Sequence, residues 1–430
     1  MDLLNGNIRK IYNKYLIPAI GGTLVIAAYS FVDTIAIGQG VGPNGAAACA
    51  LTTIIFGLAT FLGLLPGMGG AVLMSEAKGS GEIRKANSYF TASCIVLAVL
   101  TIPVWLGCIF YQEEIYRLFG CNDEVMPYVI DYNTIVCITL PSFIICNFLT
   151  CFIRNDGAPN LVLWASIVGA IVNIVGDWLF VFPMQMGMFG AALATVLGSL
   201  IQLVMMVGYF FTKRCSIRFK RVQNLIDSAG KIIVNGFGAG FTQITILIFM
   251  FVINNQIMKY SGVAMLALYG IINSIASLYA NVFCGVGQAV QPIASINYGA
   301  GNRDRCWEVY RLGFRTTVIL GVIFSALGLF FPVQTIQFFT KTTPEMLELA
   351  PFVVRTYCAS FLFLGLNIYL SVYFQSVLEA RKSTVIGILR GVVVNCTFIY
   401  LFPLFWGADG IWIAIPAAET LVLALVSCQQ

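Results

Sequence analysis

The stretch ASIVGAIVNIVGDWLFVFP, residues 165–183, decides the fold class of this chain. As an α-helix it would measure about 28 Å, at about 1.5 Å per residue, which is close to the roughly 30 Å thickness of the hydrocarbon core of a bilayer. The stretch nevertheless contains a carboxylic acid, Asp177, and an amide one helical turn earlier, Asn173. A membrane-spanning helix that keeps an acid needs an explanation from the rest of the chain.

The composition of the 430 residues indicates an integral membrane protein. Hydrophobic residues make up 59% of the chain and charged residues 10%, against roughly 45 to 50% and about 25% in soluble domains. Apolar stretches long enough to cross a bilayer lack the alternation of barrel strands, so we expect helices. Twelve such spans are predicted, at residues 15–38, 46–74, 87–111, 127–153, 160–183, 188–211, 231–257, 262–290, 306–332, 350–377, 384–404 and 408–428.

The distribution of Lys and Arg predicts the orientation, because cytoplasmic loops carry an excess of these residues. With the N-terminus inside, the outer loops hold only Arg117, Lys259 and Lys341. The inner segments hold Arg9, Lys10, Lys14, Lys78, Arg84, Lys85, Arg154, Lys213, Arg214, Arg218, Lys220, Arg221, Lys231, Arg303, Arg305, Arg381 and Lys382. We therefore expect a multi-pass cell-membrane protein, in a prokaryotic plasma membrane, with both termini cytoplasmic. The net charge of +5 reflects this topology, and nothing suggests a nucleic-acid partner.

An internal repeat organises the chain. GMGGAVLMSEAKGSGEIRKA (67–86) is similar to GVGQAVQPIASINYGAGNRDRC (285–306), and FPMQMGMFGAALA (182–194) is similar to FPLFWGADGIWIA (402–414). Six helices separate the copies, so we predict two six-helix lobes, residues 1–211 and 232–430, related by an axis along the membrane normal. A basic cytoplasmic linker, residues 212–231, joins them. Parallel repeats around a central cavity are typical of alternating-access transporters.

Counting residues from the ends of the spans predicts a polar cluster in the first lobe. Asp33, Tyr132, Asp177 and Thr195 each lie roughly 7 to 11 Å below the outer boundary at about 1.5 Å per residue, and Asn173 lies one turn deeper than Asp177. An acid at a helix centre costs about 2.5 to 3.5 kcal/mol on insertion scales, and intramembrane acids are usually functional. The alternative is that both acids pair with a buried base or sit in wet helix ends.

The second lobe carries different chemistry. Residues 228–303 contain no Asp or Glu, and the one deep acid of this lobe is Glu419 in the last span. Arg390 in the preceding span could pair with it, so structural and functional interpretations of Glu419 both stay open. Pro18 in the first span could begin that helix or bend it.

The residue types argue against an enzyme and against a resident metal or cofactor. The chain has no His, so a zinc site lacks its usual ligands. Its thirteen cysteines form no C-x-x-C pair and fall mostly inside spans, where Cys packs as a small apolar residue. We expect no cofactor.

Five further stretches make the chain resemble a known family. These stretches are VDTIAIGQGVG (32–42), FIRNDGAPN (152–160), NIVGDWLFVFP (173–183), GMFGAALAT (187–195) and QPIASINYGAGNRDR (291–305). They resemble signature stretches of the multidrug and toxic compound extrusion (MATE) family, closest to its prokaryotic DNA-damage-inducible and staphylococcal-type branches. The likeness covers nearly the whole chain and implies cation-coupled antiport of organic, often cationic, compounds.

The resemblance also implies roles for particular residues. Asp33, Tyr132, Asn173, Asp177 and Thr195 match the cation site of the first lobe, the cluster that the depth count selects independently. Pro18 matches a proline at which the first helix bends, and Asn147 matches a cavity residue, although its depth lies nearer the cytoplasm. The chain lacks the acids that other branches carry in helices 7, 8 and 10, which favours coupling through the first lobe.

We therefore predict a monomeric antiporter that exports amphipathic, cationic organic compounds in exchange for H⁺ or Na⁺, with small organic substrates and membrane lipids as its partners. Sodium bound at Asp33 and Asp177 is the alternative to a proton there. A flippase for lipid-linked sugars is a second function, but it should have a strongly basic cavity. A passive channel is a third, which accumulation against a gradient would exclude.

The topology can be tested by labelling. A single cysteine at position 216, in a background without native cysteines, should react with an impermeant maleimide only from the cytoplasmic side, because the charge bias is spread over many residues. Labelling from outside intact cells would contradict the predicted orientation.

Overall fold

The chain folds into helices. The structure is a computed structural model that describes residues 3–119, 121–337 and 344–427, and these contain no β-strand. Three predicted features lie outside the described residues. They are Lys341, the end of the last span at residue 428, and the two ends of the chain, where the first lobe begins and the second lobe ends.

The helices of the first half precede an irregular segment, residues 212–224. They are α1 (Ile8–Gly40), α2 (Pro43–Gly79), α3 (Ile83–Phe110), α4 (Gln112–Leu118), α5 (Met126–Ile138), α6 (Leu140–Asn155), α7 (Pro159–Val181), α8 (Gly187–Gly208) and the 3-10 turn η1 (Tyr209–Phe211). The second half contains α9 (Leu225–Gly299), α10 (Arg303–Phe330), α11 (Pro332–Gln337), α12 (Pro344–Ala359), α13 (Phe361–Ser376), α14 (Ala380–Ile388), the π-helical turn η2 (Leu389–Val393), α15 (Val394–Leu401) and α16 (Pro403–Ser427).

The prediction of twelve spans is confirmed. Among the described residues, 11 helical stretches are long and apolar enough to cross a membrane, and α5 with α6 makes a twelfth. These two helices meet at a bend of 56°, so the span predicted at 127–153 is present as a broken one. Pro141 explains the break, because a proline removes a backbone donor and disfavours helical geometry at the residue before it.

The backbone repeats itself as the sequence similarity predicts. Positive φ angles recur at an interval of 220 residues, at Gly42 and Gly262, at Gly81 and Gly301, and at Gly187 and Gly407. Gly157 (φ 92°) has its counterpart in Leu378 (φ 60°) one residue further on. A side chain in this conformation costs about 1 to 2 kcal/mol. The fold therefore retains the left-handed turn even where the second half has lost the glycine.

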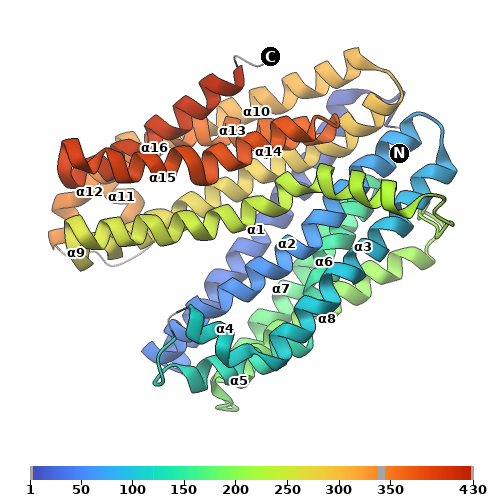
Figure 1. Cartoon of the computed structure of the whole chain (residues 1–430). Coiled ribbons are helices and arrows are strands. Elements are labelled where there is room, and N and C mark those ends of the chain that lie inside the picture. Colours follow the sequence, from blue (N-terminus) through green and yellow to red (C-terminus); the bar gives the residue numbers. More distant parts are fainter. Residues whose placement is uncertain (1–2, 120, 338–343, 428–430) are drawn as a thin grey trace.

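The two halves meet at one end of the molecule. Figure 1 shows the helices of the two halves converging at the end that carries the N-terminus and residues 212–224, here called the linker end, and diverging toward the other end. A Cβ atom on Gly79 would lie 1.9 Å from the carbonyl oxygen of Ile296, and one on Gly299 would lie 1.9 Å from that of Glu76. Gly79 and Gly299 are equivalent in the repeat, so the axis relating the halves passes between them.

Hydrogen bonds reinforce the linker end. The Tyr12 hydroxyl of α1 donates to Thr316 Oγ1 of α10 at 2.9 Å. The Asn297 amide donates to the carbonyl of Leu3 at 3.1 Å, and the Arg305 guanidinium donates to that of Gly6 at 2.8 Å. The second half thus holds the N-terminal segment in place.

The irregular segment 212–224 lies against the first half. Asp156, at the end of α6, forms an ion pair with Lys78 Nζ at 2.5 Å and accepts the backbone N–H of Ser216 at 2.9 Å. The backbone N–H of Arg218 donates to Asn87 Oδ1 at 2.6 Å. This segment is therefore fixed to one half before the chain crosses to the other.

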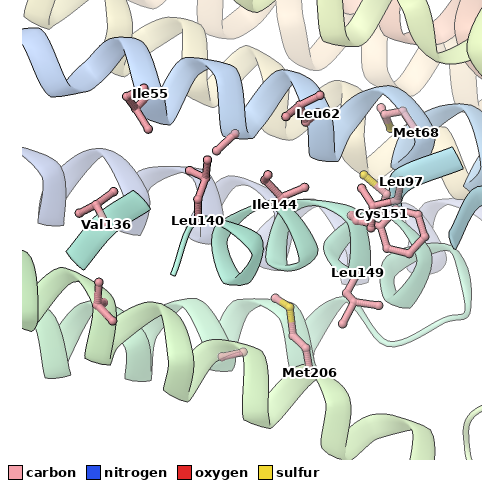
Figure 2. Packing of buried hydrophobic residues seen from close by; sticks show 14 of the residues in the cluster. Ile55, Leu62, Met68, Leu97, Val136, Leu140, Ile144, Leu149, Cys151 and Met206 are labelled. Atoms are coloured by element: carbon pink, nitrogen blue, oxygen red, sulfur yellow. The ribbon is translucent and has the colours of Figure 1, made fainter. Parts of the chain in front are cut away.

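A hydrophobic core stabilises the first half around the α5–α6 bend. Figure 2 shows Ile55 and Leu62 of α2 facing Leu140 and Ile144 of α6, with Met206 of α8 on the other side of α6. All five side chains are at least nine-tenths buried. The core supports the helices on which the polar cluster lies.

Replacing one glycine with a larger residue tests the close backbone contact at the linker end. Gly299→Leu should destabilise this arrangement by about 1 to 3 kcal/mol, because the side chain has no space against α2. Thermal unfolding should report the loss, and spin labels at positions 84 and 381 should move apart. Gly270→Leu is the control, because a Cβ at Gly270 meets nothing within 4 Å. An unchanged label distance and unfolding temperature would contradict the close backbone contact.

Candidate functional site

Four helices bring the predicted cluster together. Asp33 lies on α1, Tyr132 on α5, Asn173 and Asp177 on α7, and Thr195 on α8. All five side chains are buried. The residues come from four separate spans. The sequence places them at a similar depth in the membrane, and the fold brings them close together.

Thr195 is the centre of a hydrogen-bond network. Its Oγ1 donates to the carbonyl of Ala191 at 3.1 Å, as a helical threonine often does. Thr195 accepts a bond from the Asn173 amide at 3.2 Å, and a further hydrogen bond of 3.3 Å, in which either hydroxyl can donate, joins it to Tyr132. Asn173 Oδ1 has no donor among the described residues.

Asp33 and Asp177 are in direct side-chain contact. Neither oxygen of Asp177, nor Oδ1 of Asp33, accepts a hydrogen bond from a described donor, and no ion pair among the described residues involves either acid. Ionised carboxylates only accept hydrogen bonds, so two of them repel unless a proton or cation lies between them. The arrangement can therefore hold one small positive charge.

A cavity of about 730 Å³ lies between the halves and reaches this pair. Asp33, Tyr132 and Thr195 line it from the first half, whereas Arg390 and Glu419 line it from the second. Asp177 is not among the lining residues and is 1% exposed, so it lies behind Asp33. A mainly apolar cavity with a few convergent polar groups is typical of a site for small organic molecules.

Pro18 lines the same cavity from α1. The helix begins at Ile8 and runs unbroken through Pro18 to Gly40, so the interpretation of Pro18 as a helix start is wrong. The predicted beginning of this span at residue 15 was too late, because Asn7 caps the helix by accepting from the Lys10 N–H. A proline inside a helix leaves the carbonyl four residues earlier, that of Lys14, without its usual donor.

Glu419 has the partner that the sequence suggested. Its Oε1 lies 2.8 Å from Arg390 Nε, and its Oε2 accepts from the Asn367 amide at 2.8 Å. Arg390 lies in the π-helical turn η2, an irregularity that often occurs at functional sites. Asn147 also lines the cavity, but its amide donates to the carbonyl of Phe143 at 3.0 Å, and no hydrogen bond joins it to the Thr195 network.

Sequence reasoning missed the charged cavity residue Arg154. It was counted in an inner loop, but it lies in the last turn of α6, is 6% exposed and lines the cavity. The missed signal is the glycine that follows, because Gly157 has the positive φ of a helix-terminating residue. The predicted span ends at residue 153, just before the first charged residue, whereas α6 ends two residues later, at Asn155.

Comparison with known proteins agrees with this architecture. The MatE family model matches the chain twice, over residues 18–179 and 239–401. The multidrug export protein MepA of Staphylococcus saprophyticus is 24% identical over 411 residues, 95% of this chain and 90% of that protein. MepA of Staphylococcus aureus is 23% identical over 429 residues, 96% of this chain and 92% of that protein.

Solved structures share the fold. A MATE transporter in complex with MaL6 superposes with a TM-score of 0.92 at 22% identity, covering 99% of this chain and 96% of that one. A MATE family transporter of the MOP superfamily in an outward-facing conformation has a TM-score of 0.90, with the same identity and coverage.

The Thr195 network predicts non-additive stability. Thr195→Val removes the hydrogen-bond partner of two buried groups, which should cost about 1 to 3 kcal/mol. Tyr132→Phe should cost less in that background than in the wild type, because its bond is already absent. Thermal unfolding of the single and double variants in one detergent measures this coupling. Thr134→Val is the control, because the hydroxyl of the exposed Thr134 on α5 donates to the carbonyl of Ile130 and takes no part in the network. Strictly additive effects would contradict the network.

Proposed function

We propose that this chain, which belongs to the MatE family, exports amphipathic organic compounds, cationic ones included, in exchange for an inward-moving cation. The family match makes it a multi-pass multidrug-export transporter and not an enzyme. The finer points, which are the coupling ion, the charge of the substrate and the orientation in the membrane, are our proposal.

The observation that carries the proposal is the contact between Asp33 and Asp177 without a basic partner. A transporter coupled to a cation needs a site that gains and loses one positive charge beside the substrate cavity. The carboxyl pair satisfies that need, because Asp33 lines the cavity while Asp177 lies behind it.

We favour the proton as the coupling ion. A proton shared between two carboxyl groups explains their contact with no further ligand. Sodium is the alternative, since the free Oδ1 of Asn173 could join the carboxylates as an oxygen ligand. The absence of acids from the spans at 231–257 and 262–290 argues for coupling in the first lobe in either case.

The proposed transport cycle uses the two lobes, residues 1–211 and 232–430, as rocking units joined by the linker at 212–231. Excess Lys and Arg at the linker end supports a cytoplasmic location for that end and for both termini. The closed contacts at Gly79 and Gly299 then correspond to an outward-facing state. Protonation removes charge from the carboxyl pair, lets α1 bend near Pro18 and expels the substrate outward.

A flippase for lipid-linked sugars and a passive channel are the competing functions. The cavity is not strongly basic, because Arg154 and Arg390 are balanced by Asp33 and Glu419, which disfavours the flippase. We propose that the protein works as a monomer in a prokaryotic plasma membrane. Accumulation of substrate against its gradient would exclude a channel.

The pH dependence of binding tests the coupling. Binding of protons and substrate must be linked reciprocally, with a usual coupling of about 1 to 3 kcal/mol or roughly 5- to 150-fold in affinity. Because protonation disfavours the substrate-bound state, affinity should rise with pH in the wild type and be flat in Asp177→Asn, which should also abolish active efflux. Substrate affinity in nanodiscs between about pH 5.5 and 8.5 measures this.

Asp131→Asn is the matched control, because Asp131 is exposed on α5 beside Tyr132. It should keep the wild-type response. A wild type whose affinity ignores pH and responds only to sodium would replace the proton with sodium. Wild-type efflux by Asp177→Asn would contradict the role of the pair.

A further inference from the structure

Arg154 is a buried cation without a protein partner. Its side chain is 6% exposed and lines the cavity. Among the described residues, no hydrogen bond or ion pair involves its guanidinium group, whereas Arg390, the other cavity arginine, is bonded to Glu419. A buried charge that lacks a partner is destabilising. An unpaired buried arginine lowers the stability of the fold. A bound anion would compensate its charge, which points to a ligand.

The surroundings of Arg154 place it at the linker end of the cavity, between the halves. The turn that follows Arg154 lies against α1, because a Cβ at Gly157 would lie 3.8 Å from the Tyr15 hydroxyl. Cys284 on α9 lines the same cavity as Arg154. Gln288 lies one helical turn after Cys284, so it is on the same face of α9, and it also lines the cavity. No described group donates to Gln288 Oε1. The unpaired guanidinium of Arg154 and the amide of Gln288, whose Oε1 accepts no hydrogen bond from a described donor, thus come from opposite halves.

This position is separate from the acid pair. Tyr15 and Asp33 are 18 residues apart on the continuous helix α1, which corresponds to about 27 Å at about 1.5 Å per residue. One end of the cavity therefore carries a negative site and the other an unpaired positive one. The apolar residues Ala19, Leu64 and Met68 line the same cavity.

We propose that Arg154 and Gln288 form an anion-binding subsite that takes the carboxylate of an amphipathic substrate. The proposal rests on the proposed export function and deepens it, because it assigns the residues that would recognise a carboxylate on a zwitterionic substrate. A guanidinium presents two parallel N–H donors to a carboxylate, and the Gln288 amide supplies a further donor. Because the two residues belong to different halves, a bound carboxylate also bridges the halves at the linker end.

The experiment uses two forms of one dye. A rhodamine ethyl ester is a cation, and the same rhodamine as the free carboxylic acid is a zwitterion at neutral pH. Fluorescence polarisation gives the Kd of each form for the full-length protein in nanodiscs at one pH. The ratio of the two Kd values, acid over ester, isolates the contribution of the carboxylate.

Arg154→Gln should raise this ratio about tenfold or more, because a hydrogen bond to a charged group is worth about that much in affinity. Arg154→Lys should raise it less, since it keeps the charge and loses the paired donors. Arg315→Gln is the matched control, because Arg315 is exposed on α10 and is not among the cavity-lining residues. It should leave the ratio unchanged.

An unchanged ratio in a folded Arg154→Gln protein would overturn the subsite. If that variant does not fold, Gln288→Leu makes the same comparison, with a rise of about two- to tenfold expected and an unchanged ratio overturning the proposal. Failure of the wild type to bind either dye would contradict the export function itself. Binding of the ester with a normal pH response, but no effect of Arg154→Gln on the ratio, would contradict only the subsite.

A free anion is the competing occupant, and exchanging chloride for gluconate separates the two sources. Chloride that competes with the acid form and not with the ester supports a subsite for the substrate carboxylate. Chloride that raises the unfolding temperature of the wild type but not of Arg154→Gln, together with an unchanged dye ratio, would assign the site to a free anion and overturn the proposal.

Discussion

The contact between Asp33 and Asp177 is the interaction on which the rest of the site depends. In water two carboxylates would separate, but here helices α1 and α7 hold them together in a region without a basic partner. Their repulsion is removed only by a positive charge between them. In the proposed cycle, binding of one small cation at this pair changes how α1 packs against α7, and that change is coupled to substrate.

The two halves show that a shared backbone does not impose a shared chemistry. The left-handed turns at Gly42 and Gly262, and at Gly187 and Gly407, give both halves the same path. Yet the first half keeps an acid pair, whereas the second neutralises Glu419 with Arg390. The backbone path is shared, so the asymmetry between the halves lies in the side chains.

The linker end combines rigidity with reversibility. Close backbone approach at Gly79 and Gly299 gives extensive contact without bulky side chains that interlock, and the bonds from Arg305 to the N-terminal segment are polar and exchangeable with water. The proposed transport cycle requires this interface to open and close. Arg154 lies at this end of the cavity, so a ligand bound there would act on the same interface.

The sequence by itself determined the twelve spans, the repeat and the members of the polar cluster, because hydropathy and depth follow directly from position along a helix. It also suggested the Arg390–Glu419 pair. Only the tertiary structure decided how far each helix is rotated and bent, and hence the break before Pro141, the acceptor role of Thr195 and the contact of Asp33 with Asp177. For the same reason, the sequence predicted a loop position for Arg154. Its burial depends on α1 and α9, which are distant from it in sequence. A local sequence pattern does not indicate which distant helices will pack against the end of a helix.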